Sequence, residues 1–181
     1  MARIEPVQES EAEGKAAALL AKIREDWGQS WNVIGGIANN PAVLEGFIAL
    51  TAAQTKSGLS EAERELIDIE MARVNGCHYC VPAHRFVAAE SGFDRGMMDA
   101  AARGEDLPGD GPEAVLLRLV RRLAASGGKL EDEEFQAFQD QGIEPAKMIA
   151  VIGEIALCHI TNSFNRLAQT ELDDFLKPYD Y

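Results

Sequence analysis

The residues with the clearest chemical potential are two cysteines and a histidine that lie close together in the chain. They occur in the segment Cys77-His-Tyr-Cys80-Val-Pro-Ala-His84. A helix turns about 100° per residue, so Cys77, Cys80 and His84 fall at about 0°, 300° and 340° around its axis. The spacing therefore predicts that both sulfurs and the imidazole share one narrow stripe of a helix.

The start of that helix favours ionised sulfur. Asn75-Gly76 precedes the cysteines and is a typical helix stop, so Cys77 is expected at or near the N-terminus of the next helix. The free N–H groups and the positive end of the helix dipole stabilise a thiolate there, and the thiolate is the nucleophilic form of cysteine. An ordinary cysteine, with a pKa of about 8.5, is only slightly ionised at neutral pH without such help.

Two further groups complete a possible proton relay. His84 lies four residues beyond Cys80 and could accept its proton, while Glu65 on the preceding helix could orient the imidazole. Cys77 would then resolve a sulfenic acid formed on Cys80 by closing a disulfide. Taken alone, Glu65 is better explained as an exposed helix charge, one of several in the acidic run Glu61-Ala-Glu-Arg-Glu65.

The elements around this segment are expected to be helices. The chain has 27 alanines against nine valines and four threonines, and no run alternates as a half-buried strand would. Asn40-Pro41 and Ser60-x-x-Glu63 are helix-start signals, and Gly35-Gly36 is expected to break the chain. The predicted helices cover 9–27, 41–55, 61–74, the cysteines to Ser91, 93–103, 112–125, 131–141 and 145–170. We predict a single all-α domain of seven or eight helices.

Composition narrows the class of protein. The 181 residues carry 17 Lys+Arg and 30 Asp+Glu, a net charge of −13 that disfavours nucleic acid and anionic membranes as partners. No run of 18 apolar residues could span a bilayer, and the acidic N-terminus does not resemble a signal peptide. We therefore expect a cytoplasmic protein. Its three cysteines are too few for a disulfide scaffold, so the Cys77/Cys80 pair indicates a redox site or a metal site.

Zinc is the main alternative for the pair. Cys77, Cys80 and His84 would supply three ligands, and Cys158 or His159 a fourth. One helical stripe is an unusual carrier for three structural ligands, and the chain has no second Cys-x-x-Cys. A zinc-stabilised, non-enzymatic interaction module is therefore kept as a hypothesis behind redox chemistry.

Several other residues have plain structural interpretations. Cys158 is expected to be a buried small hydrophobe, and His78 an exposed residue secondary to the site. Tyr79 is either a core or interface aromatic or a substrate contact, and His159 is ambiguous. We expect core or subunit-interface anchors at four aromatic positions: Trp27, Trp31, Phe47 and Phe86.

The motif resembles that of a known group of enzymes. Glu65-x(11)-Cys77-x-x-Cys80-x-x-x-His84 is similar to the active-site pattern of alkylhydroperoxidase AhpD-like proteins of the carboxymuconolactone decarboxylase superfamily. The string NGCHYCVPAH most resembles the peroxidase-related branch. The resemblance is strongest over about residues 40–105 and continues into Asn162 and Asn165-Arg166. AhpD itself has histidine two positions after its first cysteine, where this chain has Tyr79.

The resemblance implies a function and an assembly. An AhpD-like domain over residues 1–181 would be a thiol-dependent peroxidase, in which Cys80 attacks the hydroperoxide, Cys77 resolves, and Glu65 and His84 relay protons. It also implies a homo-oligomer, trimer or hexamer, that needs no cofactor and no metal and is recharged by a thiol reductant. The alternative within the same chemistry is a thiol–disulfide oxidoreductase or electron adaptor without peroxide turnover.

Overall fold

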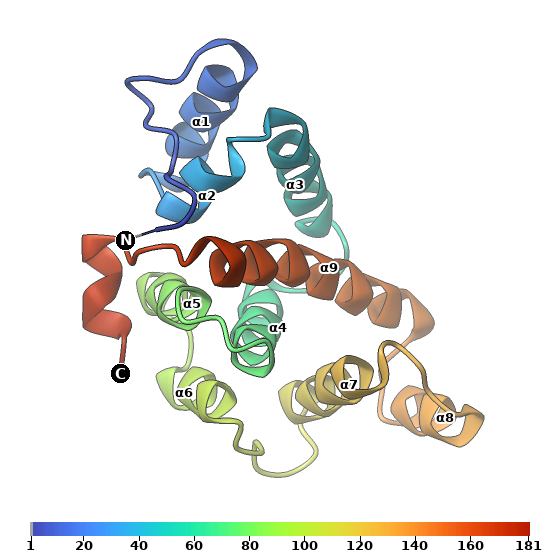
Figure 1. Cartoon of the computed structure of the whole chain (residues 1–181). Coiled ribbons are helices and arrows are strands. Elements are labelled where there is room, and N and C mark those ends of the chain that lie inside the picture. Colours follow the sequence, from blue (N-terminus) through green and yellow to red (C-terminus); the bar gives the residue numbers. More distant parts are fainter. Residues whose placement is uncertain (1) are drawn as a thin grey trace.

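The computed structural model describes residues 2–181, which form helices joined by short loops (Figure 1). Residues 2–181 contain no β-strand, and the all-α prediction is confirmed. The helices described are α1 (Gly14–Trp27), α2 (Asn32–Ile37), α3 (Pro41–Gln54), α4 (Glu61–Val74), α5 (Cys80–Glu90), α6 (Arg95–Arg103), α7 (Pro112–Ser126), α8 (Asp132–Asp140), α9 (Pro145–Ala168) and the 3₁₀ helix η1 (Asp174–Tyr179).

The predicted helix starts are made by the expected side chains. The Asn40 side chain accepts a hydrogen bond from the Val43 N–H at 3.4 Å and begins α3. Ser60 and Glu63 form both bonds of a capping box at the start of α4, at 3.2 Å and 2.8 Å. These caps satisfy N–H groups that a helix end leaves free, which fixes where each helix begins.

The prediction was wrong at Gly35-Gly36, where the chain forms the short helix α2 rather than a break. The two glycines are needed for close packing. A Cβ atom on Gly36 would lie 2.3 Å from Cζ of Phe164 on α9, and one on Gly35 would lie 2.9 Å from Cβ of Pro6.

The N-terminal helix also begins later than predicted, at Gly14. The Gln8 carbonyl accepts hydrogen bonds from the N–H groups of Glu11 and Ala12, so residues 8–12 form a turn instead of helix.

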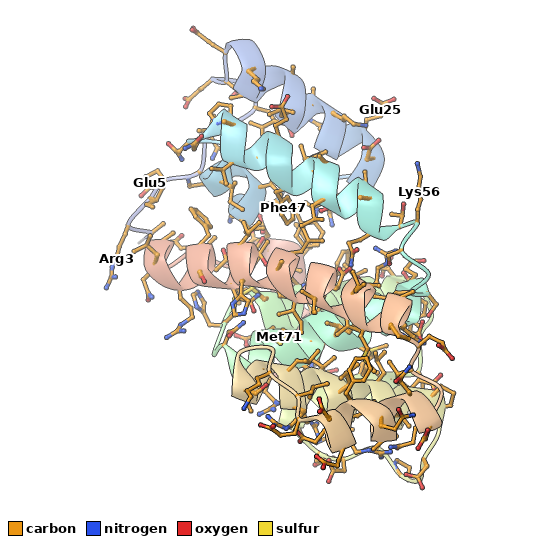
Figure 2. The ribbon with its side chains drawn as sticks, turned by 90° about the vertical axis from the view of Figure 1, so that its right-hand side faces the viewer. Arg3, Glu5, Glu25, Phe47, Lys56 and Met71 are labelled. Atoms are coloured by element: carbon orange, nitrogen blue, oxygen red, sulfur yellow. A yellow bond between two sulfur atoms is a disulfide. The ribbon has the colours of Figure 1, made fainter. Side chains whose placement is uncertain are left out.

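Helix α9 is the longest element and runs through the middle of the molecule. Figures 1 and 2 show α1–α3 on one side of it and α7 and α8 on the other. Helix α4 packs against α9 and also against α5, α6 and α7. The buried apolar side chains form two clusters, one around α4, α6, α7 and α9 and one around α1, α2, α3 and α5. Cys77 and Cys80 belong to the second cluster, close to α4 and α9, whereas Cys158 belongs to the first.

The C-terminal segment packs on α5 of the same chain. The Phe175 ring in η1 lies 5.0 Å from Trp31 and 5.2 Å from Phe86, measured between ring centroids. This contact covers α5 and closes the second cluster. Within residues 2–181, no helix has the length and apolar character needed to cross a membrane.

The glycine contacts give a test of the fold. Gly36→Ala should destabilise the protein by on the order of 1–3 kcal/mol, because the new methyl group displaces the Phe164 ring in a packed core. Gly46→Ala is the matched control, since Gly46 is exposed on α3 with nothing within 4 Å of its missing Cβ, and it should be neutral or stabilising. Urea unfolding of both variants measures the difference. Equal stability of the two would contradict the close approach.

Candidate functional site

The two cysteines of the motif are joined by a disulfide. Cys80 is the first residue of α5, and Cys77 lies in the turn before it, with 5.4 Å between their Cα atoms. The Cys80 N–H points at the Cys77 sulfur, at 3.2 Å. The positive end of α5 therefore faces the sulfurs, and this arrangement favours a thiolate once the disulfide is reduced.

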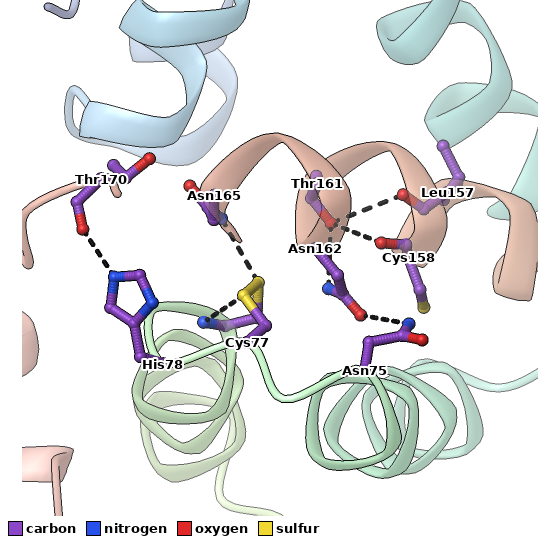
Figure 3. The surroundings of a disulfide bond; sticks show 10 residues. Asn75, Cys77, His78, Leu157, Cys158, Thr161, Asn162, Asn165 and Thr170 are labelled. Carbon is purple, nitrogen blue, oxygen red and sulfur yellow. Dashed lines mark hydrogen bonds between the residues drawn. A yellow bond between two sulfur atoms is a disulfide. The ribbon is translucent and has the colours of Figure 1, made fainter. Parts of the chain in front are cut away.

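Helix α9 contributes a side-chain donor to the same sulfurs. The Asn165 amide donates from Nδ2 to Sγ of Cys80 at 3.3 Å, as the dashed line in Figure 3 shows. The other polar atom of the Asn165 side chain, Oδ1, is buried without a hydrogen-bond partner among the described residues. Asn165 thus gives Cys80 a hydrogen-bond donor and leaves one unused acceptor beside it. Neighbouring Asn162 does not contact the sulfurs, and its Oδ1 accepts a bond from Asn75 at 2.8 Å.

His84 and Glu65 meet as the spacing predicted. Nδ1 of His84, one turn into α5, lies 2.9 Å from Oε2 of Glu65 on α4. Both side chains line the cavity that Cys80 also lines. In this disulfide state, the described residues include no hydrogen bond between His84 and either sulfur, although His84 and Cys80 line the same cavity.

Sequence reasoning missed Asp68. Its Oδ2 lies 3.7 Å from Nδ1 of His84. Asp68 comes three residues after Glu65 and lies on the same face of α4. Its other oxygen, Oδ1, accepts a hydrogen bond from the Cys158 thiol at 2.9 Å. The signal was available, because Glu65-x-x-Asp68 places both carboxyl groups on one helix face. Cys158 is buried as expected, but its thiol also donates a hydrogen bond to the Asp68 carboxyl group, so Cys158 is more than a packed hydrophobic residue.

Burial and charge together set the proton affinities of this cluster. Burial disfavours a charged imidazole, but the carboxyl groups of Asp68 and Glu65 outweigh it and raise the pKa of His84 to about 9. Burial raises the pKa of Asp68 to about 8, although the His84 charge opposes the shift. Burial also raises the pKa of Glu154 and raises that of the Cys158 thiol well above its ordinary value. At neutral pH, His84 is therefore a proton donor rather than the free base that its position alone suggests.

The same three groups could hold a cation. The donor atoms of Glu65, Asp68 and His84 all lie within 4.8 Å of one another. This set differs from the zinc ligands that the sequence suggested, because Cys77 and Cys80 are bonded to each other here and neither offers a thiolate. A cation bound by these three groups would replace the contact between His84 Nδ1 and Glu65 Oε2, which are 2.9 Å apart.

A cavity of about 500 Å³ opens above Cys80. Its floor carries the polar groups just described, from α4, α5 and α9, together with Arg64 and Glu154. The lining also includes four aromatic side chains, from α1, α3, α5 and the residue that caps α2: Trp27, Phe47, Phe86 and Trp31. Cys77 is not among the lining residues, so Cys80 is the sulfur that faces the cavity.

The chain was compared with known proteins. Residues 41–122 match the carboxymuconolactone decarboxylase family. The solved structure of a peroxidase-related protein with an alkylhydroperoxidase AhpD core, from Ralstonia eutropha JMP134, superposes with a TM-score of 0.83 at 18% identity, over 97% of this chain and 94% of that one. The chain is therefore similar to the carboxymuconolactone decarboxylase family over residues 41–122, and it shares the fold of the solved structure over nearly its whole length.

Other solved structures share the fold. A peroxidase-related protein from Silicibacter sp. TM1040 has a TM-score of 0.78 at 18% identity, covering 94% of this chain and 93% of that one. The debrominase Bmp8 has a TM-score of 0.79 at 18% identity, covering 98% and 95%. No curated protein matches the sequence significantly. The same fold therefore occurs in proteins described by different activities.

The remaining sequence expectations fall outside the cluster. Tyr79 is a core residue, 1% exposed, whose hydroxyl donates to Asp173 in the segment before η1. Burial, together with the negative charge of Asp173, raises the pKa of this hydroxyl far above its ordinary value. His78 is exposed and lies 2.9 Å from the Thr170 carbonyl oxygen (Figure 3). His159 is exposed on α9.

The proton affinities can be tested with one variant. Asp68→Asn keeps the side-chain shape but removes a negative charge beside His84, so the pKa of His84 should fall from about 9 by about one unit or more. NMR titration of the histidine ring protons measures it, and His78 and His159 serve as internal controls. An unchanged His84 titration would contradict the proposed coupling.

The same shifts predict how stability depends on pH. His84 and Asp68 both bind a proton more tightly in the folded than in the unfolded chain. The contribution of His84 to stability is therefore present below about pH 6.5 and lost as pH rises to about 9, whereas that of Asp68 is full only below about pH 4 and is lost as pH rises to about 8. Unfolding free energies measured at pH 6.5 and 9 should differ more in the wild type than in Asp68→Asn, by on the order of 1–2 kcal/mol. His159→Gln, an exposed histidine change, should match the wild type.

Proposed function

We propose that this protein is a thiol-dependent peroxidase that reduces hydroperoxides with the Cys77–Cys80 pair. The observation that carries the proposal is the placement of a cysteine pair and the Glu65–His84 pair around one cavity, with Cys80 facing it. The match of residues 41–122 to the carboxymuconolactone decarboxylase family and the fold shared with peroxidase-related proteins support the same activity.

The first step oxidises Cys80. The Cys80 thiolate attacks the outer oxygen of the hydroperoxide ROOH, the O–O bond breaks, and the sulfur becomes a sulfenic acid. The alkoxide that leaves takes a proton from the His84 imidazolium and departs as the alcohol ROH. Asn165 and the helix N-terminus stabilise the thiolate before attack, and Glu65 holds the imidazole in place.

The second step closes the disulfide. The Cys77 thiolate attacks the Cys80 sulfur, the S–O bond breaks, and the leaving hydroxide takes a proton to become water. The sum is one dithiol and one ROOH giving one disulfide, one ROH and one water. The disulfide present in the structure corresponds to the end of this cycle. An external dithiol then restores the pair by thiol–disulfide exchange.

The burial of the sulfurs argues against a protein disulfide as the substrate. Cys77 and Cys80 are each only 2% exposed, so a folded protein has little access to either sulfur, whereas a small hydroperoxide can enter the cavity. This observation favours peroxide reduction over an electron adaptor that exchanges disulfides with other proteins.

Peroxide consumption with a dithiol reductant tests the proposal. Cys80→Ser should abolish turnover, and His84→Ala should lower kcat/KM by on the order of 10²-fold, because the leaving alkoxide loses its proton donor. His159→Ala, an exposed histidine outside the cavity, should retain wild-type activity. Cys77→Ser should still consume one equivalent of peroxide and leave a sulfenic acid on Cys80 that a dimedone probe traps.

Two outcomes would contradict the proposal. Equal rates in wild type, Cys80→Ser and His84→Ala would exclude the mechanism. Rapid reaction of the oxidised protein with thioredoxin or lipoyl donors, without any peroxide-driven turnover, would select the electron adaptor instead.

We also propose that the chain forms a homo-oligomer, a trimer or hexamer. Large apolar side chains are exposed on α9 and α3, with Ile149 70%, Leu167 63% and Ile152 51% accessible in the single chain. Light scattering should give a multiple of 19.7 kDa, and Ile152→Asp should shift the protein towards smaller species. A stable wild-type monomer at micromolar concentration would contradict this proposal.

A further inference from the structure

Part of the cavity lining is an aromatic wall, built from four rings that pack edge to face: Trp27, Trp31, Phe47 and Phe86. Trp27 ends α1 and lies 6.4 Å from both Trp31 and Phe47, measured between ring centroids. Trp31 lies 5.9 Å from Phe86 on α5. Four elements therefore place flat apolar surfaces around one space, and such surfaces pack well against another ring.

The cavity is larger than a hydroperoxide group needs. Its volume of about 500 Å³ lies within the range of about 300–1,000 Å³ that is usual for sites that hold small organic molecules. Trp27 is 38% exposed, unlike Trp31 and Phe47, so one ring of the wall remains open to solvent at the entrance. The cavity therefore has room and apolar surface for the organic group of a substrate as well as for its hydroperoxide group.

The charges on the floor do not favour an anion. Arg64 and His84 are cations there, and Asp68 keeps its proton at neutral pH. Glu65 balances one of the two cations in the oxidised protein, and the Cys80 thiolate balances the other once the disulfide is reduced. Two exposed carboxylates, Glu61 and Glu90, add negative charge elsewhere on the lining. A carboxylate-bearing substrate therefore meets no net positive charge.

One buried acceptor awaits a donor from the ligand. The Asn165 Oδ1 atom has no hydrogen-bond partner among the described residues, and its residue is fully buried beside the Cys80 sulfur. An unpaired buried acceptor is costly, and a hydroxyl or hydroperoxyl group can satisfy it. The indole N–H of Trp31 is also buried without a partner.

We infer that the cavity binds an uncharged aromatic compound that carries a hydroxyl or hydroperoxyl group. Its ring lies against the wall formed by Trp27, Trp31, Phe47 and Phe86, and its O–H points to Asn165 and Cys80. For catalysis, the inference rests on the proposed peroxidase activity and specifies its substrate as an aromatic hydroperoxide. The binding claim itself does not depend on turnover.

Calorimetry on the oxidised protein tests binding without catalysis. Three probes separate the contribution of the ring from that of charge. The first, 2-phenyl-2-propanol, is aromatic and uncharged, whereas tert-butanol lacks the ring and benzoate carries a negative charge. We expect 2-phenyl-2-propanol to bind at least about tenfold more tightly than either of the other two. Comparable affinities of all three, or tightest binding of benzoate, would overturn the inference.

Variants locate the binding surface. Trp27→Ala should weaken binding of 2-phenyl-2-propanol by about fivefold, since a ring contact is worth roughly 0.5–1.5 kcal/mol. Trp27→Leu gives a second variant that retains apolar volume and should lose part of this affinity. The control is Phe135→Ala, a similarly exposed ring on α8 outside the cavity lining, which should bind like the wild type. Unchanged binding in both Trp27 variants would overturn the assignment of the wall.

Kinetics then distinguish this inference from the proposed function. Cumene hydroperoxide should give a higher kcat/KM than hydrogen peroxide, and Trp27→Ala should lower only the former. Equal rates with both peroxides would overturn the substrate class and leave the peroxidase proposal standing. Binding of 2-phenyl-2-propanol with no turnover of any hydroperoxide would refute the peroxidase and support the binding site.

Discussion

The packing of α4 against α9 is the constraint on which the candidate site depends. Helix α4 carries Glu65 and Asp68, and α9 carries Cys158 and Asn165, so the distance between these helices sets the Asp68–Cys158 bond. Asn165 also contacts Cys80 at the start of α5, which packs against both helices. Polar groups in addition join α9 to α3. Gln54 at the end of α3 donates to Glu154 and to the Ala150 carbonyl of α9, at 2.9 Å and 2.8 Å.

This arrangement explains why buried acids are tolerated here. Isolated buried charges are costly, but each group in the cluster has a partner or keeps its proton. Asp68 accepts from a thiol, and Glu65 bonds to His84, whose charge it stabilises. The outcome is a set of protons held near Cys80 at neutral pH. A site that must protonate a leaving alkoxide needs such a supply.

Much of the site could be predicted from sequence because it depends on local spacing. Cys80 and His84 are one helical turn apart, and the capping box at Ser60 fixes the register in which α4 presents Glu65. Asp68 lay within the same spacing rule but was overlooked, since its partner Cys158 is 90 residues away in the sequence. The aromatic wall could not be predicted, because Trp27, Phe47 and Phe86 come from three helices whose packing no local pattern specifies. The Gly35-Gly36 helix was missed for the same reason: its neighbour Phe164 is distant in sequence.

The short separation of the linked cysteines has an energetic consequence. A cross-link between residues three apart closes a very small loop, so it removes little freedom from the unfolded chain: about 2 kcal/mol by the loop-entropy relation, against about 4.7 kcal/mol for a loop of 100 residues. The helices on either side are held by their own packing, α4 by α7 and α9 and α5 by η1. Opening and closing this bond therefore changes the free energy of unfolding only modestly. The molecule can store and release two electrons at this turn for a change in the free energy of unfolding of only about 2 kcal/mol.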